Sequence, residues 1–166
     1  MKKVLFMLSL SALVFSCKDE PVSPCTEAVS AEKIAAVDQT QLQKDIAAID
    51  AYLASKSIVA TADPSGLRYV ISTTGDDTKP CLESQVKVIY TGKLLTTGII
   101  FDSSKNLAVT FPLNNLILGW QIGFVNFGKG TKATLYIPSG FAYGKNAAGS
   151  IPANSNLIFD IELISF

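Results

Sequence analysis

The chain has 166 residues, 48% of them hydrophobic and 17% charged, a composition typical of a globular protein and not of a disordered one. Lys plus Arg and Asp plus Glu number 14 each, and no long basic block occurs, which argues against an electrostatic nucleic-acid binder. The chain has no His, so a Ser-His or Cys-His nucleophile pair and an imidazole metal site are excluded.

Residues 1–16 have the pattern of a secretory signal peptide. Lys2 and Lys3 precede an apolar run from Val4 to Phe15, which is shorter than the ~20 residues that a membrane-spanning helix needs. The residues Val14-Phe15-Ser16-Cys17 resemble a bacterial lipobox, in which cleavage exposes a Cys that carries lipid. We therefore expect Cys17 to anchor the chain to a Gram-negative envelope membrane. A plain signal peptide with a chance Cys is the alternative.

The residues after Cys17 divide into a tether and a helix. The first part of residues 17–37 contains Pro21, Pro24 and several acidic side chains. We expect residues 17–37 to act as a tether between the membrane and the folded domain. Residues 38–62 follow as an amphipathic helix and a linker, because one apolar stripe recurs at spacings of four, three and four. Asp38 and Gln41 form a candidate capping box at its start. The stripe consists of Leu42, Ile46, Ile49 and Leu53. We expect this helix to pack on the domain rather than to form a dimer, and the protein to be a monomer.

Residues 63–166 change from helical to alternating hydrophobicity. Alternation of apolar and polar side chains predicts half-buried antiparallel strands. Between them, residues 115–127 carry apolar side chains at helical spacing, which predicts one short helix across the sheet. The expected strands are Leu67–Ser72 and the alternating segments around Val86–Thr91, Ala133–Ile137 and Leu157–Leu163. Cys25 and Cys81 form a disulfide or stay as free thiols, and the sequence leaves both open.

Between about Ser65 and Phe166 the sequence contains a series of short motifs. They are Tyr90-Thr91-Gly92-Lys93-Leu94, Gly98-x-x-Phe101-Asp102-Ser103-Ser104, Leu116-Ile117-Leu118-Gly119-Trp120, Gly128-Lys129-Gly130, Ile137-Pro138, Ala142-Tyr143-Gly144, Ile151-Pro152-Ala153-Asn154 and Leu157-x-Phe159-Asp160-Ile161-Glu162-Leu163. In this order the motifs resemble those of the FKBP-type peptidyl-prolyl isomerases. The resemblance implies an α+β fold: a twisted five- to six-stranded antiparallel sheet wrapped around one short helix, with a shallow apolar pocket between them.

The resemblance also implies which side chains line this pocket. Trp120 would form the floor under a prolyl ring, and the backbone amides of Ile117 and Ile151 would donate to substrate carbonyls. The other implied lining residues are Tyr90, Phe101, Asp102, Val109, Leu116, Tyr143 and Phe159. Val109 stands where many relatives have an aromatic residue, and Ser150 stands where Ile is frequent. We therefore expect a less apolar rim and lower activity.

Rotation about a prolyl peptide bond suits this set of residues, because it breaks no bond and needs no nucleophile, metal, cofactor or titrating base. The implied function is peptidyl-prolyl isomerisation during the folding of exported envelope proteins, with proline-containing polypeptides as partners. A non-catalytic module that binds proline-containing segments is the main alternative, since binding and catalysis use the same surface. A structural lipoprotein that has lost its pocket is disfavoured by the retained aromatic residues.

Overall fold

The computed structural model of the protein describes residue 25 and residues 28–166. The expected signal peptide and the expected lipid anchor at Cys17 lie outside the described residues. Among the residues that are described, no helix is both long enough and apolar enough to cross a membrane.

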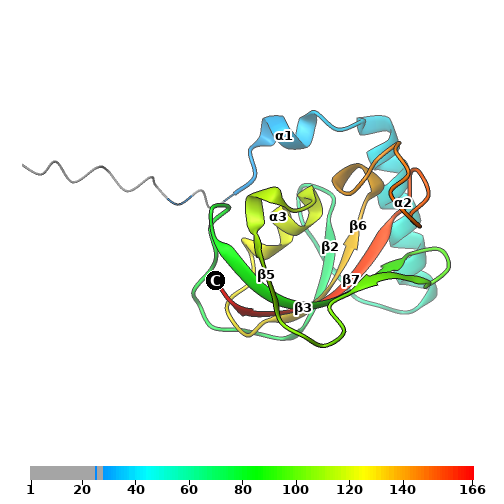
Figure 1. Ribbon diagram of the computed structural model, residues 1–166. Helices are drawn as coiled ribbons and strands as arrows, with labels where there is room; N and C mark the ends of the chain where they lie inside the picture. The colour runs from blue at the N-terminus through cyan, green and yellow to red at the C-terminus, as the bar shows by residue number, and fades with distance from the viewer. Residues whose placement is uncertain (1–24, 26–27) are drawn as a thin grey trace, which may run out of the picture.

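Within the described part of the chain, one antiparallel sheet of seven strands forms the framework, and the fold is α+β as the sequence predicts. The strand order is β1-β2-β6-β7-β3-β4, and β5 pairs with β3 as well. Figure 1 shows the sheet strongly twisted around α3. The strands are β1 (Thr61–Ala62), β2 (Arg68–Thr73), β3 (Gln85–Leu94), β4 (Ile100–Ser103), β5 (Val109–Pro112), β6 (Lys132–Ile137) and β7 (Leu157–Ser165).

The sheet has more strands than the five or six expected, because the long strand β3 has two different neighbours along one edge. Its first half, Gln85–Val88, pairs with β5, and its second half, Thr91–Lys93, pairs with β4. Both partners are only four residues long, which is too short for the alternation of side chains to identify them. The two-residue strand β1 adds the remaining pair at the opposite edge.

Helix α3 (Leu118–Phe124) is shorter than the helix predicted over residues 115–127. The residues before it form a single 3-10 turn, η1 (Leu113–Asn115), and then an extended stretch, with ψ of 167° at Leu116 and 148° at Ile117. The buried side chain of Gln121 donates from Nε2 to the carbonyls of Asn114 and Leu116, at 3.1 and 2.6 Å. These carbonyls are therefore satisfied without a helical turn.

The two faces of the sheet bury different sets of side chains, because neighbouring residues of a strand point in opposite directions. Leu135 and Phe159 lie on the face covered by α3, in the main core. Tyr136 and Ile158 lie on the other face, where they pack against Ile49 and Leu53 of α2 (Gln39–Ser55). Figure 1 shows α2 beside the sheet and apart from α3.

The predicted stripe on α2 is confirmed as its packing face. Leu42, Ile49 and Leu53 are buried, and Ile46 is partly buried against the main core. The predicted cap is present as well, because the Gln41 N–H donates to the Asp38 carboxylate at 3.0 Å. The Gln41 side chain does not complete the reciprocal half of the capping box; it donates to Asp45 Oδ1 at 2.8 Å instead.

The stretch expected to act as a tether ends in structure that belongs to the domain. A short helix, α1 (Ala31–Ala35), precedes α2, and Ile34 and Val37 pack against the main core. Cys25 and Cys81, which the sequence left open, form a disulfide with a Cα separation of 5.3 Å. The disulfide joins Cys25 to the loop before β3, so residue 25 is held to the domain.

Candidate functional site

The floor of the candidate site is the indole ring of Trp120, near the start of α3. Trp120 is 4% exposed, and its ring stacks on Phe124 at 5.0 Å and meets the edges of Tyr90 and Phe159 at 5.4 and 5.2 Å. The buried Nε1 has no hydrogen-bond partner among the described residues. The neighbours of this ring are the aromatic rings of Tyr90, Phe124 and Phe159, which are at best weak hydrogen-bond acceptors. The surroundings of the indole are therefore apolar.

Three strands supply the aromatic walls. Tyr90 comes from β3, Phe111 from β5 and Phe159 from β7, and the rings of Tyr90 and Phe111 lie 6.2 Å apart. Gly92, opposite Phe159 in the sheet, makes this packing feasible. A Cβ atom at position 92 would lie 2.7 Å from the rings of both Phe101 and Phe159.

A single hydrogen bond defines the polar edge of the site. The Tyr90 hydroxyl donates to Asp102 Oδ2 at 2.8 Å. Burial, which is the larger cause, and the hydrogen bond to Asp102 together raise the pKa of Tyr90 to about 12. The phenol is therefore neutral at physiological pH, and the exposed Asp102 side chain presents its other oxygen at the rim.

These residues enclose a pocket of about 170 Å³ between α3 and the sheet. Seven of the ten side chains that the sequence indicated line it together. They are Tyr90, Asp102, Leu116, Ile117, Trp120, Tyr143 and Phe159. Phe111 is the eighth lining residue, and sequence reasoning missed it. The sequence could have indicated Phe111, because side chains two residues apart in a strand lie on the same face, and Val109 was already assigned to the pocket.

The other three indicated residues lie close to the pocket without lining it. Phe101 packs edge-on against Phe159 at 5.5 Å, behind the wall. Val109 pairs with Val88 in the sheet. Ile151 is buried, and its N–H donates to the Ala148 carbonyl at 2.9 Å within a tight turn. The Ile151 amide thus donates within its own turn, and its expected role as a donor to substrate stays a prediction.

The Ile117 amide differs from the Ile151 amide. Ile117 precedes α3 in extended conformation, and its carbonyl accepts from the Trp120 N–H at 2.9 Å. Its own N–H donates to no other described residue. A backbone donor at the pocket lining is therefore available to a ligand carbonyl.

A buried carboxylate, which sequence reasoning missed, holds the loop that carries Tyr143. Asp45 of α2 is 3% exposed, and its Oδ2 accepts from the Ser139 hydroxyl at 2.6 Å and from the Ser139 N–H at 2.9 Å. The Ser139 carbonyl in turn accepts from the Gly144 N–H at 2.8 Å, which closes the turn containing Tyr143. The N-terminal helix therefore positions one side of the pocket.

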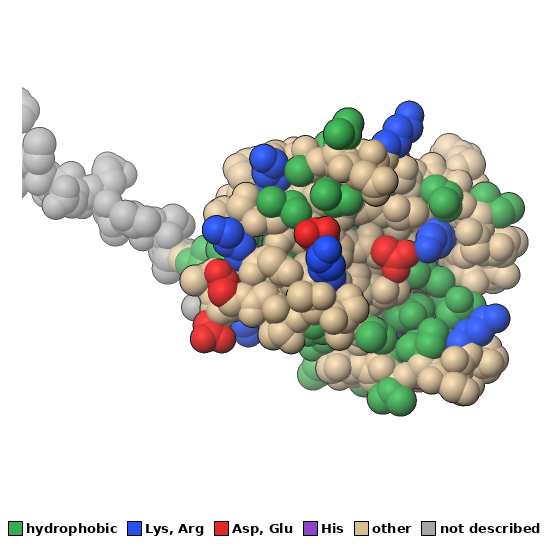
Figure 2. Space-filling view, turned by 90° about the horizontal axis from the view of Figure 1, so that it is seen from below, with side chains coloured by type: hydrophobic (Ala, Val, Ile, Leu, Met, Phe, Trp, Pro, Cys, Tyr) green, Lys and Arg blue, Asp and Glu red, His purple; other side chains and the backbone are tan. Residues whose placement is uncertain are grey.

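Among the described residues, no group of three or more His, Cys, Asp or Glu side chains could hold a metal ion. Figure 2 shows charged side chains of both signs scattered singly over one face of the molecule, with no large basic patch on it. Apolar side chains gather on part of the same face.

Comparison with known proteins identifies the part of the chain that carries the pocket. Residues 76–164 match the family model described as FKBP-type peptidyl-prolyl cis-trans isomerase. The chain is 47% identical over 103 residues to the FKBP-type peptidyl-prolyl cis-trans isomerase FkpA of Aeromonas hydrophila, covering 61% of this chain and 38% of that protein. It is 40% identical over 103 residues to the FKBP-type 22 kDa isomerase of Escherichia coli, covering 60% of this chain and 50% of that protein.

A solved structure supports the same assignment. The chain resembles a crystal structure of a peptidyl-prolyl cis-trans isomerase from Pseudomonas syringae pv. tomato with a TM-score of 0.64 and 32% sequence identity. The similarity covers 74% of this chain and 93% of that one. The chain thus spans half or less of the curated relatives described above, but nearly the whole of this solved domain.

Proposed function

The chain belongs to the FKBP-type peptidyl-prolyl cis-trans isomerase family, and we propose that it catalyses rotation about the peptide bond that precedes proline in polypeptides. The observation that carries this proposal is the pocket of about 170 Å³ with Trp120 as its floor and Tyr90, Phe111 and Phe159 as its walls. A small apolar ring fits such a pocket, and a charged side chain does not.

The apolar pocket accounts for how the barrier falls. Resonance gives a peptide bond a rotational barrier of ~18–20 kcal/mol, and unaided prolyl bonds interconvert in tens to hundreds of seconds. The planar amide is more polar than the twisted one, so water favours the planar form. Holding the prolyl ring among aromatic side chains removes that water and favours the twisted form.

The polar rim orients the substrate while the bond turns. The Ile117 N–H donates to no other described residue, and we expect it to hold a substrate carbonyl. Tyr143 can donate from its hydroxyl, and Asp102, fixed by Tyr90, can accept from a substrate N–H. No covalent bond between substrate and protein forms in this scheme.

A protease-coupled isomerisation assay on the chain from residue 18 onward, with Cys25 retained, tests this function. We expect kcat/KM for a short prolyl peptide well above the uncatalysed background. The variants Tyr143→Phe and Asp102→Asn keep the shape of the pocket and should lower kcat/KM about three- to tenfold, the size of one hydrogen bond. Binding of the peptide without turnover would instead support the alternative function, a module that binds proline-containing segments.

The catalytic rate is expected to be independent of pH near neutrality. The chain has no His, and carboxyl groups and phenols ordinarily titrate outside the interval from about pH 6 to pH 8. The measurement is kcat/KM across this interval, with folding followed by circular dichroism. A sigmoidal step in a protein that stays folded would contradict the proton-free mechanism and require a titrating group in the pocket.

At high pH the fold itself should weaken. The folded-state pKa of Tyr90 is raised from 10.0 to about 12, so the neutral phenol stabilises the folded state below about pH 10 and this contribution is lost as the pH rises toward 12. Burial raises the pKa of Tyr69 and Tyr136 as well, with the same sign. The free energy of unfolding should fall above pH 10, and less steeply in Tyr90→Phe.

We propose further that the enzyme acts in the cell envelope, attached to a membrane through lipid on Cys17, on exported proteins that are still folding. The signal-like residues 1–16 and the Cys at position 17 support this placement. The Cys25–Cys81 disulfide also supports it, since disulfides persist in oxidising compartments.

Cys17→Ser is expected to abolish lipid attachment and to leave the leader uncleaved by the lipoprotein route. Labelling of cells with a fatty acid, followed by isolation of the protein, measures both outcomes. Cys25→Ser is the matched control and should remain labelled. Equal labelling of Cys17→Ser and the parent protein would refute the anchor.

A further inference from the structure

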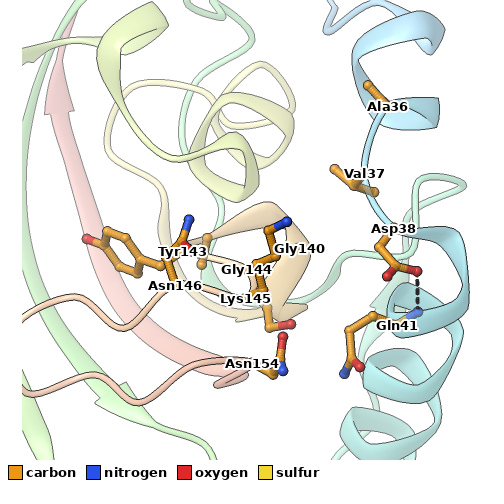
Figure 3. Close-up of a pocket in the computed structure, with 12 residues that line it drawn as sticks. Ala36, Val37, Asp38, Gln41, Gly140, Tyr143, Gly144, Lys145, Asn146 and Asn154 are labelled. Atoms are coloured by element: carbon orange, nitrogen blue, oxygen red, sulfur yellow. Dashed lines mark hydrogen bonds between the residues drawn. The ribbon is translucent and has the colours of Figure 1, made fainter.

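A second cavity lies beside the prolyl pocket and is larger, about 660 Å³. We call it the N-terminal groove. Figure 3 shows its two walls: the turn between α1 and α2 with the first residues of α2 on one side, and the loop after η2 (Ser139–Phe141) on the other. Its volume falls within the range of about 300–1,000 Å³ that ligand sites occupy.

Hydrogen bonds fix the two walls relative to each other. Asp45 of α2 binds Ser139 at the base of the loop, and Gln41, which lines the groove, donates to Asp45 Oδ1. Asp38 caps the same helix through the bond drawn in Figure 3. The groove is therefore a built feature of the domain rather than a gap between loosely held segments.

Three carboxamide side chains contribute to the polar lining of the groove. Figure 3 shows Gln41 and Asn154 directed into the space from opposite walls, with Asn146 on the loop side. A carboxamide both donates and accepts, as a peptide group does. The groove has one anionic side chain, Asp38, and one cationic one, Lys145, so it lacks the basic cluster that phosphate ligands require. Ala36 and Val37 add apolar contact.

The groove adjoins the prolyl pocket above Trp120, because Tyr143 lines both. Its ring, which is 40% exposed, points away from the groove in Figure 3, while its backbone borders the groove. An extended polypeptide whose prolyl ring rests on Trp120 can pass over Tyr143 and continue between the two walls. A small molecule confined to either cavity would leave the other unused.

We propose that the N-terminal groove is the binding site for the polypeptide segment that flanks the isomerised proline. The segment is extended and uncharged, and its peptide groups pair with the carboxamides of the two walls. The proposal rests on the proposed isomerase function. It adds that residues 36–41, which lie before the segment that matches the family model, contribute to the choice of substrate.

The test compares a short prolyl peptide with the same peptide lengthened by uncharged polar residues, on the amino side in one arm and on the carboxyl side in the other. With the full chain, kcat/KM and calorimetric Kd should improve about five- to tenfold in one arm, as one or two added hydrogen bonds predict. Ala36→Trp, which narrows the groove, should remove this gain and leave the short peptide unaffected.

Two further variants keep the test decisive. Asn146→Ala removes one carboxamide from an exposed position, where the side chain makes no hydrogen bond to another described residue, and it should lower the gain about threefold. Ala47→Trp places the same bulk on an exposed position of α2 outside the groove and should keep the gain.

Each result distinguishes the groove from the isomerase function. A parent chain that acts on short and lengthened peptides equally well refutes the groove and leaves the isomerase function intact. An equal effect of Ala36→Trp on short and long peptides also refutes it. A parent chain that neither binds nor isomerises the short peptide refutes the proposed function, and the groove proposal falls with it.

Discussion

Trp120→Ala should reduce kcat/KM about 30-fold or more, because the substrate ring loses the apolar surface beneath it, worth about 2 kcal/mol. The same change should lower the free energy of unfolding by about 3–5 kcal/mol, the usual cost of removing a buried aromatic ring. Trp120 is 4% exposed and contacts three other rings, which places it in that class. Chemical denaturation and the coupled assay measure the two effects separately.

Phe127→Ala is the control that separates an effect on the pocket from an effect on the stability of the fold. Phe127 is fully buried and packs against Tyr69 and Phe124, at 5.3 and 6.1 Å, but does not line the pocket. The Phe127→Ala variant should lose about as much free energy of unfolding as Trp120→Ala while keeping its activity per folded molecule. If both variants lose activity in proportion to their loss of stability, Trp120 has no special role as the pocket floor.

Asp45→Ala is expected to destabilise the protein by about 2–3 kcal/mol, since the buried Ser139 hydroxyl loses its charged acceptor. The turn closed by Ser139 carries Tyr143, so KM for a prolyl peptide should rise more than kcat falls. Denaturant titration gives the first value and a full rate profile gives the second. Asp45→Asn, which retains an acceptor oxygen, should recover part of both.

Asp50→Ala provides a matched comparison on the same helix. Asp50 pairs with Arg68 at 2.8 Å, but its side chain is 48% exposed, and exposed ion pairs contribute about 0–1 kcal/mol. A loss of stability in Asp45→Ala no larger than in Asp50→Ala would contradict the assignment of Asp45 as the residue that positions the loop.

Regular periodicity predicted most of the fold. The stripe from Leu42 to Leu53 identified α2, because a helix of 17 residues repeats its buried face several times. The long strand β7 was equally clear, since buried and partly buried side chains alternate over residues 159–164. The strands β4 and β5 were missed, since four residues carry too little pattern and their neighbours are set by β3.

The candidate site was predicted from ordered motifs rather than from periodicity. Motif order located Trp120, Tyr90 and Phe159, which the chain brings together from α3, β3 and β7. Motifs do not describe contacts between distant segments, and Asp45 and Ser139 are 94 positions apart. Asp45 itself could have been noticed, because it lies on the buried face of α2. A buried carboxylate without a hydrogen-bond donor is costly, so its position predicts a donor from another segment.

The order of the strands has a consequence for when the protein can fold. The last strand, β7, lies at the centre of the sheet, between β6 and β3. Until residues 157–165 are available, β2 and β6 on one side and β3, β4 and β5 on the other have no strand to join them. Phe159, a wall of the pocket, arrives with that same segment. A chain that lacks this segment can therefore form at most two separate half-sheets, and β7 completes the sheet and the pocket together.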